Sequence, residues 1–271
     1  MIYNKDIQSF GKKHRILQQD YDYMYLLPHP QLREYISHYS ITFDFISDNY
    51  IMMPNYNTSL VITTRNLNIN VIGSTTMPYF IGSDTCETFV IIVFQPAGFY
   101  ALTGIPQDEL IDRTIPFESI DPILCKLLSD RVDKAKNINE LVMAFDTLFL
   151  SNLNMCCHPQ LKAIFQNISD CGGNTSLRKL SNEIHYSERH LNRVIQKHVG
   201  VSAKYLSRLV RINKALNLLK DCNNNITFVS EAAGFHDSSH FIREFKLLCG
   251  ITPLEYCNNM SNFYSAIIDF F

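Results

Sequence analysis

The feature that most constrains the fold of this chain is a repeat within its last hundred residues. Four positions recur with similar residues after an offset of fifty: Leu191, Arg193, Gly200 and Leu206 correspond to Phe241, Arg243, Gly250 and Tyr256. A repeat of this length corresponds to one small supersecondary unit. The region is therefore predicted to contain two similar units in tandem.

Each unit has the sequence pattern of two short helices joined by a tight turn. In the first unit the turn is His185-Tyr186-Ser187, with apolar positions before it (Leu177, Leu180, Ile184) and after it (Leu191, Val194, Ile195). In the second unit the turn is Gly234-Phe235-His236, with Phe228, Val229, Ala232 and Ala233 before it and Phe241 and Phe245 after it. This arrangement predicts two helix-turn-helix units, and the second helix of such a unit enters the major groove of DNA.

The second helix of each unit has a face opposite to its apolar one that carries the candidate DNA contacts. In the first unit this face consists of Arg189, Asn192, Arg193 and Gln196, with Lys197 beside it; in the second it consists of Ser239, Ile242, Arg243 and Lys246. The polar side chains can donate or accept hydrogen bonds at base edges or phosphates. Ile242 suits a thymine methyl group, and an ordinary core contact is the alternative; both interpretations stay open.

A continuous helix is predicted between the two units. Its apolar stripe recurs at helical spacing over about 16 residues, at Tyr205, Leu209, Ile212, Leu216 and Leu219. Such a helix spans about 25 Å, and one turn of B-DNA is about 34 Å. One monomer is therefore expected to contact two successive major grooves, the alternative being that one unit docks at a time.

The pattern of residue types at fixed spacings in residues 174–257 resembles that of a known family. The resemblance lies in Gly234-Phe235, Ser239-His240-Phe241, Phe245-Lys246, Gly250-Ile251-Thr252-Pro253 and Tyr256, and in Arg211, Ala215 and Leu218-Leu219 of the connector. By these residues the region is similar to the AraC/XylS transcription regulators. The resemblance implies DNA-contacting roles for Arg189, Asn192 and Arg193 in the first unit and for Ser238, Ser239, Ile242 and Arg243 in the second.

Several positions depart from the pattern of that family. His185 stands where the first turn usually has Gly, and His enters the left-handed conformation more readily than most residues. Ala203 and Leu206 replace a usual Pro and a usual aromatic residue, so the start of the connector helix is less well defined. Cys257 replaces a common Arg and removes one expected phosphate contact.

The formal net charge of −2 is unevenly distributed along the chain. Residues 1–171 carry 12 Lys and Arg against 18 Asp and Glu, whereas residues 172–257 carry 12 against 7. A basic part joined to an acidic part is typical of a nucleic-acid-binding module attached to a domain that does not bind phosphate. Turn-forming residues at 169–176 mark the boundary, so we predict an N-terminal domain (1–171), a DNA-binding domain (172–257) and a tail (258–271).

The N-terminal half is predicted to be rich in β-strands, with helices from about residue 123, which makes the whole chain α+β. Short apolar runs occur at residues 39–45, 59–64, 69–72 and 88–94. Through Pro30, Leu32-Arg33-Glu34-Tyr35-Ile36, Met53-Pro54, residues 94–100 and Leu110, this half resembles cupin-like sensing domains. The resemblance implies a barrel with flanking helices that senses a small molecule or mediates dimerisation.

Two further expectations concern the predicted N-terminal domain and tail. A helical stripe made of Ile138, Leu141, Val142, Phe145, Leu148 and Phe149 packs either on the barrel or against a second copy of the chain. The aromatic tail at residues 262–271 is expected to pack onto the body of the protein.

These patterns favour a sequence-specific transcription regulator over an enzyme, because no catalytic set and no phosphate-binding loop is found. The eight cysteines lack zinc-site spacing, and His29 and His38 are too far apart for a His-x-His pair, so neither metal nor cofactor is expected. The expected partner is double-stranded DNA, and a small-molecule effector, a second copy of the chain in a homodimer and RNA polymerase are candidates. A purely protein-binding N-terminal half is the alternative to an effector sensor. Without an apolar segment or leader pattern, we expect a cytoplasmic protein that does not bind membranes.

Overall fold

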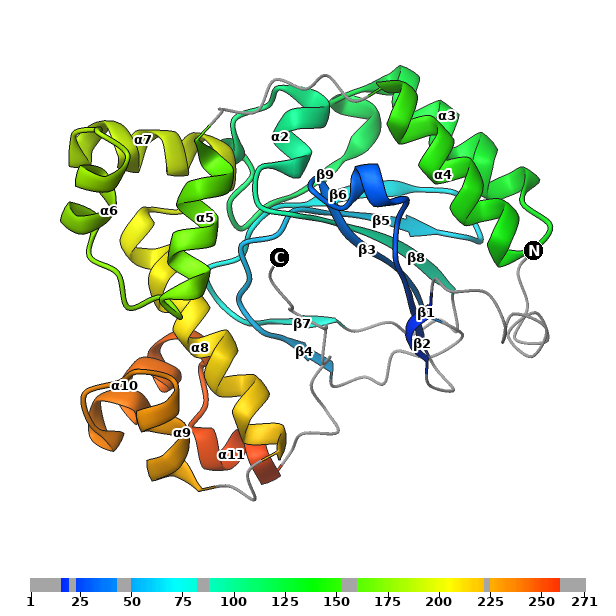
Figure 1. Cartoon of the computed structure of the whole chain (residues 1–271). Coiled ribbons are helices and arrows are strands. Elements are labelled where there is room, and N and C mark those ends of the chain that lie inside the picture. The colour runs from blue at the N-terminus through cyan, green and yellow to red at the C-terminus, as the bar shows by residue number, and fades with distance from the viewer. Residues whose placement is uncertain are drawn as a thin grey trace. The chain divides into compact units, whose positions relative to one another are not determined.

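The computed structural model describes residues 16–19, 23–42, 50–81, 88–152, 160–221 and 225–258. These residues belong to two compact units, and Figure 1 labels helices and strands of both. The first unit contains Met1–Ile46, Asn57–Gly73 and Ser83–Cys157, and the second contains Ser47–Tyr56, Ser74–Gly82 and His158–Phe271. Two short segments of the N-terminal half thus belong to the unit that contains the helix-turn-helix repeat. The tail at 262–271 lies outside the described residues, as do residues 43–45 of the first expected strand.

The first unit is built on an antiparallel sheet of seven strands. In spatial order these are β1 (Ile16–Gln19), β2 (Tyr23–Leu26), β3 (Ile36–Thr42), β8 (Phe89–Phe94), β5 (Ser59–Thr63), β6 (Ile69–Ile72) and β9 (Thr114–Pro116). Burial alternates along β5 and β8, as expected for strands with one face in the core. Ile92 of the central strand β8 lies opposite Tyr39 of β3 on one side and opposite Leu60 of β5 on the other. This register aligns the three side chains on the buried face.

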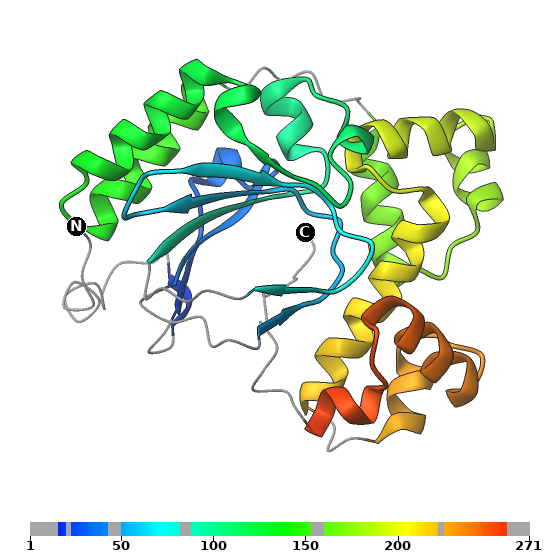
Figure 2. The same cartoon turned by 180° about the vertical axis from the view of Figure 1, so that it is seen from behind.

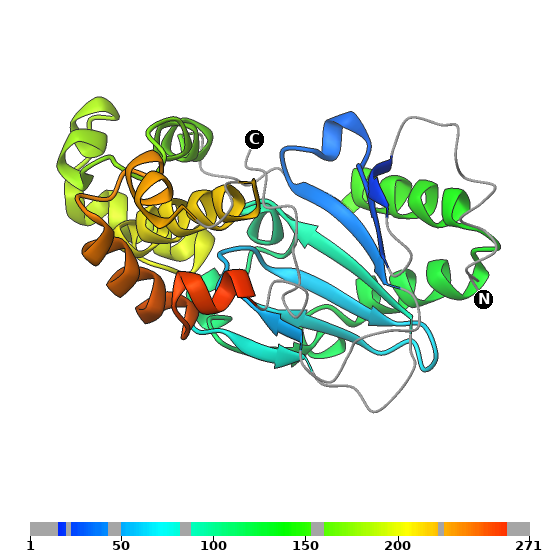
Figure 3. The same ribbon diagram turned by 90° about the horizontal axis from the view of Figure 1, so that it is seen from below.

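Helices cover that face of the sheet. They are α2 (Gly98–Thr103), α3 (Pro122–Lys134) and α4 (Ile138–Asn152), with the short 3-10 turns η1 (Pro30–Leu32), η2 (Gln107–Glu109) and η3 (Phe117–Ser119). Figures 1 and 2 show α3 and α4 lying along the sheet, and in Figure 3 the strands pass in front of both helices. All six residues of the stripe on α4 are buried in this core. The stripe therefore packs on the sheet and is not available as a dimer seam.

The prediction of a β-rich half with flanking helices and of an all-helical repeat is confirmed, but the cupin-like barrel needs correction. Within the described residues the sheet is open, with β1 and β9 as its edges. The physical reason is that α3 and α4 bury the apolar face, so a layer of helices completes the core and the sheet has no need to close on itself. The strands β4 (Tyr50–Met52) and β7 (Tyr79–Ile81) pair with each other in a separate antiparallel sheet of two strands.

The second unit consists of this two-stranded sheet, with its adjoining segments, and seven helices among the described residues. The helices are α5 (Leu161–Asp170), α6 (Leu177–Glu183), α7 (Glu188–Val199), α8 (Ala203–Asp221), α9 (Ile226–Ala232), α10 (Ser238–Cys249) and α11 (Pro253–Asn258). The predicted connector is α8, which has 19 residues and is about 28 Å long. Four residues of its predicted stripe (Leu209, Ile212, Leu216, Leu219) are buried and Tyr205 is half-buried, so the connector prediction is confirmed.

The start of α8 is well defined although Ala203 and Leu206 depart from the family pattern. The Ala203 N–H donates to Asn192 Oδ1 at 3.0 Å, and the Tyr205 N–H donates to Ser202 Oγ at 3.2 Å. These bonds satisfy backbone donors that the first turn of a helix leaves unpaired. Leu206 is buried and takes the core position of the usual aromatic residue.

We call residues 50–56 and 74–81 the strap, because within the second unit they contact α8 and the ends of both repeat units. Ser74 Oγ donates to the carbonyl of Val199 at 3.1 Å, and Tyr205 Oη donates to the carbonyl of Thr76 at 2.8 Å. Met53, which is 7 % exposed, belongs to the same apolar core as Phe245 of α10. No local pattern in the sequence indicates these contacts.

Candidate nucleic-acid interface

The two candidate recognition helices are α7 and α10, and their ends are built alike. Ser187 caps α7 by accepting from the His190 N–H, and Asp237 caps α10 by accepting from the His240 N–H at 2.7 Å. Gly200 and Gly250 end the two helices with φ values of 94° and 75°, a conformation that favours glycine. The fifty-residue repeat of the sequence is thus a repeat of complete capped helices.

Tight turns orient these helices against the first helix of each unit. His185 has a φ of 57° and Gly234 a φ of 81°, so both turns use the left-handed region. The expectation that His185 tolerates this conformation is confirmed. At Gly234 the positive φ favours glycine, and a Cβ there would lie 1.9 Å from Asn174 Nδ2, so the Asn174 side chain would have to move.

On α7 three of the five candidate side chains are exposed to solvent. They are Arg189, Arg193 and Lys197, which lie on the side away from the buried Leu191 and Ile195. The Arg193 guanidinium is 2.9 Å from His190 Nδ1, one helical turn before it. This contact orients the guanidinium along the exposed face and leaves other donors for DNA.

Asn192 and Gln196 are half-buried and have a structural task in addition to the predicted one. Asn192 Nδ2 donates to Gln196 Oε1 at 3.1 Å, while its Oδ1 accepts from the Ala203 N–H. The Asn192 amide therefore ties α7 to the start of α8. The spacing of these residues suggested only contacts with base edges or phosphates, because the loop that brings Ala203 back to Asn192 has no marker in the sequence.

On α10 the candidate face is exposed except at its first residue. Ser238 is half-buried, whereas Ser239, Arg243 and Lys246 are exposed. Arg243 Nε donates to the carbonyl of Ser239 at 3.2 Å. Ile242 is 38 % exposed and lies outside the buried aromatic core of Phe235, Phe241, Phe245 and Tyr256. An apolar contact of Ile242 with a base methyl group stays a prediction.

An ion pair that the sequence analysis missed fixes α10 on the connector. Arg208 Nε of α8 donates to Glu244 Oε2 of α10 at 2.7 Å, and both side chains are about one-fifth exposed. Their charges lie 36 residues apart in the sequence, so helical spacing alone gives no sign of the pair. A charged hydrogen bond in this partly buried setting restrains the rotation of α10 about its axis.

Local electrostatics keep the cap of α10 ionised. Hydrogen bonds from the His236 ring and from the His240 N–H hold the pKa of the Asp237 carboxyl below its ordinary value. A carboxylate at this position also interacts favourably with the positive end of the helix dipole.

No group of three His, Cys, Asp or Glu side chains that could hold a metal ion occurs in the part of the chain that the structure describes. No described helix is both long and apolar enough to cross a bilayer.

Two capped recognition helices on one connector define the second unit as a tandem helix-turn-helix DNA-binding domain. Comparison with protein families agrees: residues 180–259 match a family described as a helix-turn-helix domain. Residues 24–116 match a family described as a domain of unknown function (DUF6597). The C-terminal part of the chain is a helix-turn-helix domain of the AraC type, and the resemblance stated from its sequence is confirmed.

Known relatives share this part of the chain. An uncharacterized HTH-type transcriptional regulator of Bacillus subtilis, YisR, is 32% identical over 82 residues, which cover 30% of this chain and 29% of that protein. The multiple antibiotic resistance protein MarA of Salmonella typhimurium is 31% identical over 81 residues, which cover 30% of this chain and 64% of that protein. The matched region thus spans less than two-thirds of the length of these relatives.

A solved structure is also similar to part of this chain. The C-terminal domain of AraT, a response regulator from Geobacillus stearothermophilus, is 23% identical with a TM-score of 0.37, and the match covers 43% of this chain and 96% of that domain.

Proposed function

We propose that this protein is a sequence-specific transcription regulator that contacts two successive major grooves through α7 and α10. The observation that carries the proposal is the pair of exposed faces, Arg189 to Lys197 and Ser239 to Lys246, on equally capped helices joined to one rigid connector. The connector is about 28 Å long, which is comparable to the 34–36 Å repeat of B-DNA. The excess of Lys and Arg in residues 172–257 supplies attraction to phosphate. The protein would act where a bacterial genome lies, in the cytoplasm.

We further propose that the first unit controls DNA binding through a small-molecule effector. The support is a polar second face of its sheet, where Tyr25, His38, Ser40 and Thr42 lie and where the Tyr25 and His38 rings meet at 5.1 Å. His38 Nε2 and Thr42 Oγ1 are buried and have no hydrogen-bond partner among the described residues. Buried polar atoms without partners are costly, and a polar ligand would satisfy them. The alternative is a first unit that binds only protein, as a homodimer or with another partner.

Selection of binding sites from random DNA by the purified full chain tests DNA recognition. We expect an enriched site with two conserved blocks about one helical turn apart, roughly 10 base pairs between their centres. One block alone would show that a single unit docks, and no enrichment above random DNA would contradict the proposal.

Native mass spectrometry of the purified full chain tests the effector proposal. A non-covalent mass adduct that disappears in a His38→Phe variant supports a ligand on the polar face of the sheet. A dimer without any adduct, unchanged by added metabolite extract, would favour the protein-binding alternative.

A further inference from the structure

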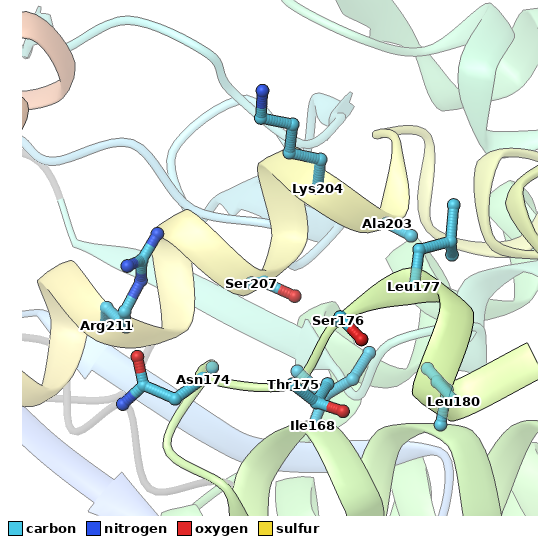
Figure 4. Close-up of a pocket in the computed structure, with 11 residues that line it drawn as sticks. Ile168, Asn174, Thr175, Ser176, Leu177, Leu180, Ala203, Lys204, Ser207 and Arg211 are labelled. Atoms are coloured by element: carbon cyan, nitrogen blue, oxygen red, sulfur yellow. The ribbon is translucent and has the colours of Figure 1, made fainter. Parts of the chain in front are cut away.

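The second unit contains a pocket of about 430 Å³ where its parts join. Its walls are the end of α5, the loop that leads into α6, the start of α6 and the first half of α8. Figure 4 shows Ser207 of α8 facing the loop residues Thr175 and Ser176, with Leu177 and Leu180 at one side. This volume lies within the range of pockets that bind small molecules.

Two polar groups of the pocket lack partners. Thr175 Oγ1 and Arg211 Nε are buried and have no hydrogen-bond partner among the described residues. Arg211 remains charged in a protein, and its guanidinium lies 5.3 Å from the centre of the Phe235 ring. Within the described residues no Asp or Glu lines the pocket, and Glu244 of α10 acts on the Arg211 charge from outside the lining. The two unpartnered donors and the positive charge of Arg211 therefore favour an anionic occupant.

Part of the remaining lining is apolar. Ile168 and Leu180 are buried, Leu177 is half-buried, and Ala203 closes the end near α7. An inorganic ion would leave this side without a partner, whereas a small organic anion can cover it with carbon atoms.

The position of the pocket connects it to both helix-turn-helix units. Ser176 caps α6, the first helix of the first helix-turn-helix, by accepting from the Lys179 N–H at 3.1 Å. Asn174 packs against Gly234, and Arg211 packs on Phe235, so the opposite wall of the pocket supports the turn of the second helix-turn-helix. Gly173 allows the loop to lie this close to α8, since a Cβ there would be 2.3 Å from the Ser207 carbonyl oxygen.

We propose that this pocket binds a small organic carboxylate. The carboxylate accepts hydrogen bonds from Arg211 Nε and from the Thr175 hydroxyl, and its apolar body packs on Ile168, Leu177 and Leu180. An occupant ties the loop to α8 and so stiffens the joint between the two recognition helices. The effect on DNA binding rests on the proposed function, whereas the binding of the carboxylate does not.

Calorimetric titration of the full chain with hexanoate and benzoate, and with the neutral 1-hexanol and benzyl alcohol, tests the pocket. We expect at least one carboxylate to bind about tenfold or more tightly than its alcohol, since a charged hydrogen bond is worth roughly 1.5–3 kcal/mol. Thr175→Val should weaken that binding about tenfold and Thr175→Ser should restore it. Ser207→Leu should abolish it by filling the pocket, with circular dichroism to show that the variants are folded.

Three results would overturn the proposal. They are equal affinity for carboxylate and alcohol, no effect of Thr175→Val or Ser207→Leu, and no binding of either carboxylate at millimolar concentration. A DNA titration without carboxylate tests the other source of an anion, a phosphate of the DNA backbone. If Thr175→Val weakens DNA binding and lowers its salt dependence, the pocket holds such a phosphate instead of a carboxylate. If the carboxylate binds but the wild-type chain selects no DNA site, the pocket stands and the proposed function fails.

Discussion

At the scale of single residues, Arg193 and Arg243 are the two side chains on which sequence recognition most depends. They occupy equivalent positions on α7 and α10, and both are exposed. Each can bond O6 and N7 of a guanine with two donors. We expect Arg193→Ala and Arg243→Ala each to cost about 1–3 kcal/mol of binding free energy and to relax sequence preference at one place in the site. Binding-site selection with each variant measures this.

The exposed Lys197 and Lys246 provide matched controls on the same two helices. If they contact only phosphate, Lys197→Ala and Lys246→Ala should weaken all sequences alike and lower the salt slope by about one. Unchanged affinity and preference in Arg243→Ala would mean that α10 supports α7 without contacting bases.

A second residue-scale prediction concerns pH. Burial lowers the pKa of His38 from its ordinary value of 6.5 to about 4. Between these values the unfolded chain binds more protons than the folded chain, so the free energy of unfolding falls as the pH decreases. From pH 7 to pH 5 the loss should be about 2 kcal/mol.

Urea denaturation of the full chain at both pH values measures this loss, and a His38→Gln variant should show a smaller one. An equal pH dependence in wild type and variant would contradict the assignment to His38.

At the scale of elements, the contact between Arg208 and Glu244 should control how α10 is presented. Glu244→Gln removes the charge but keeps the shape, and we expect it to lower the free energy of unfolding by about 1–2 kcal/mol. The affinity loss should be confined to the half-site that α10 contacts. Thermal unfolding and site selection measure the two effects, with Glu231→Gln on the exposed face of α9 as control. A loss at the half-site of α7 instead would show that the pair does not act on α10.

The sequence predicted the elements that follow one local period and failed where distant segments meet. Leu209, Ile212, Leu216 and Leu219 recur at 3.6-residue spacing, which was sufficient to predict α8. The turns before α7 and α10 were also predicted, because their residues are neighbours in the sequence. The strap was not, because Met53, Ser74 and Thr76 find their partners on helices more than a hundred residues away.

The open sheet shows the same limit. Alternation along β5 and β8 indicates strands with one buried face but does not say what covers that face. The apolar stripe on α4 was compatible with packing on the sheet or on a second copy of the chain. Only the structure shows that it packs on the sheet.

At the scale of the whole molecule, the strap makes a prediction about dissection. A fragment of residues 174–260 contains both recognition faces and should bind DNA by itself. It lacks the strap, so it loses the bonds at Val199 and Tyr205 and the contact of Met53. We expect it to melt below the full chain, and we expect Met53→Ala in the full chain to cost about 2–5 kcal/mol. Gel shift and thermal unfolding measure these effects, and loss of all DNA binding by a folded fragment would contradict the prediction.

The strap also bears on the order in which the chain acquires its structure during synthesis. An isolated pair of strands is at best marginally stable in water, and the partner of Ser74 is made 125 residues later. At translation rates of about 5–20 residues per second, the strap waits roughly 6–25 s after it is made. The helix-turn-helix unit, although last in the chain, is therefore completed by a piece that was among the first to leave the ribosome.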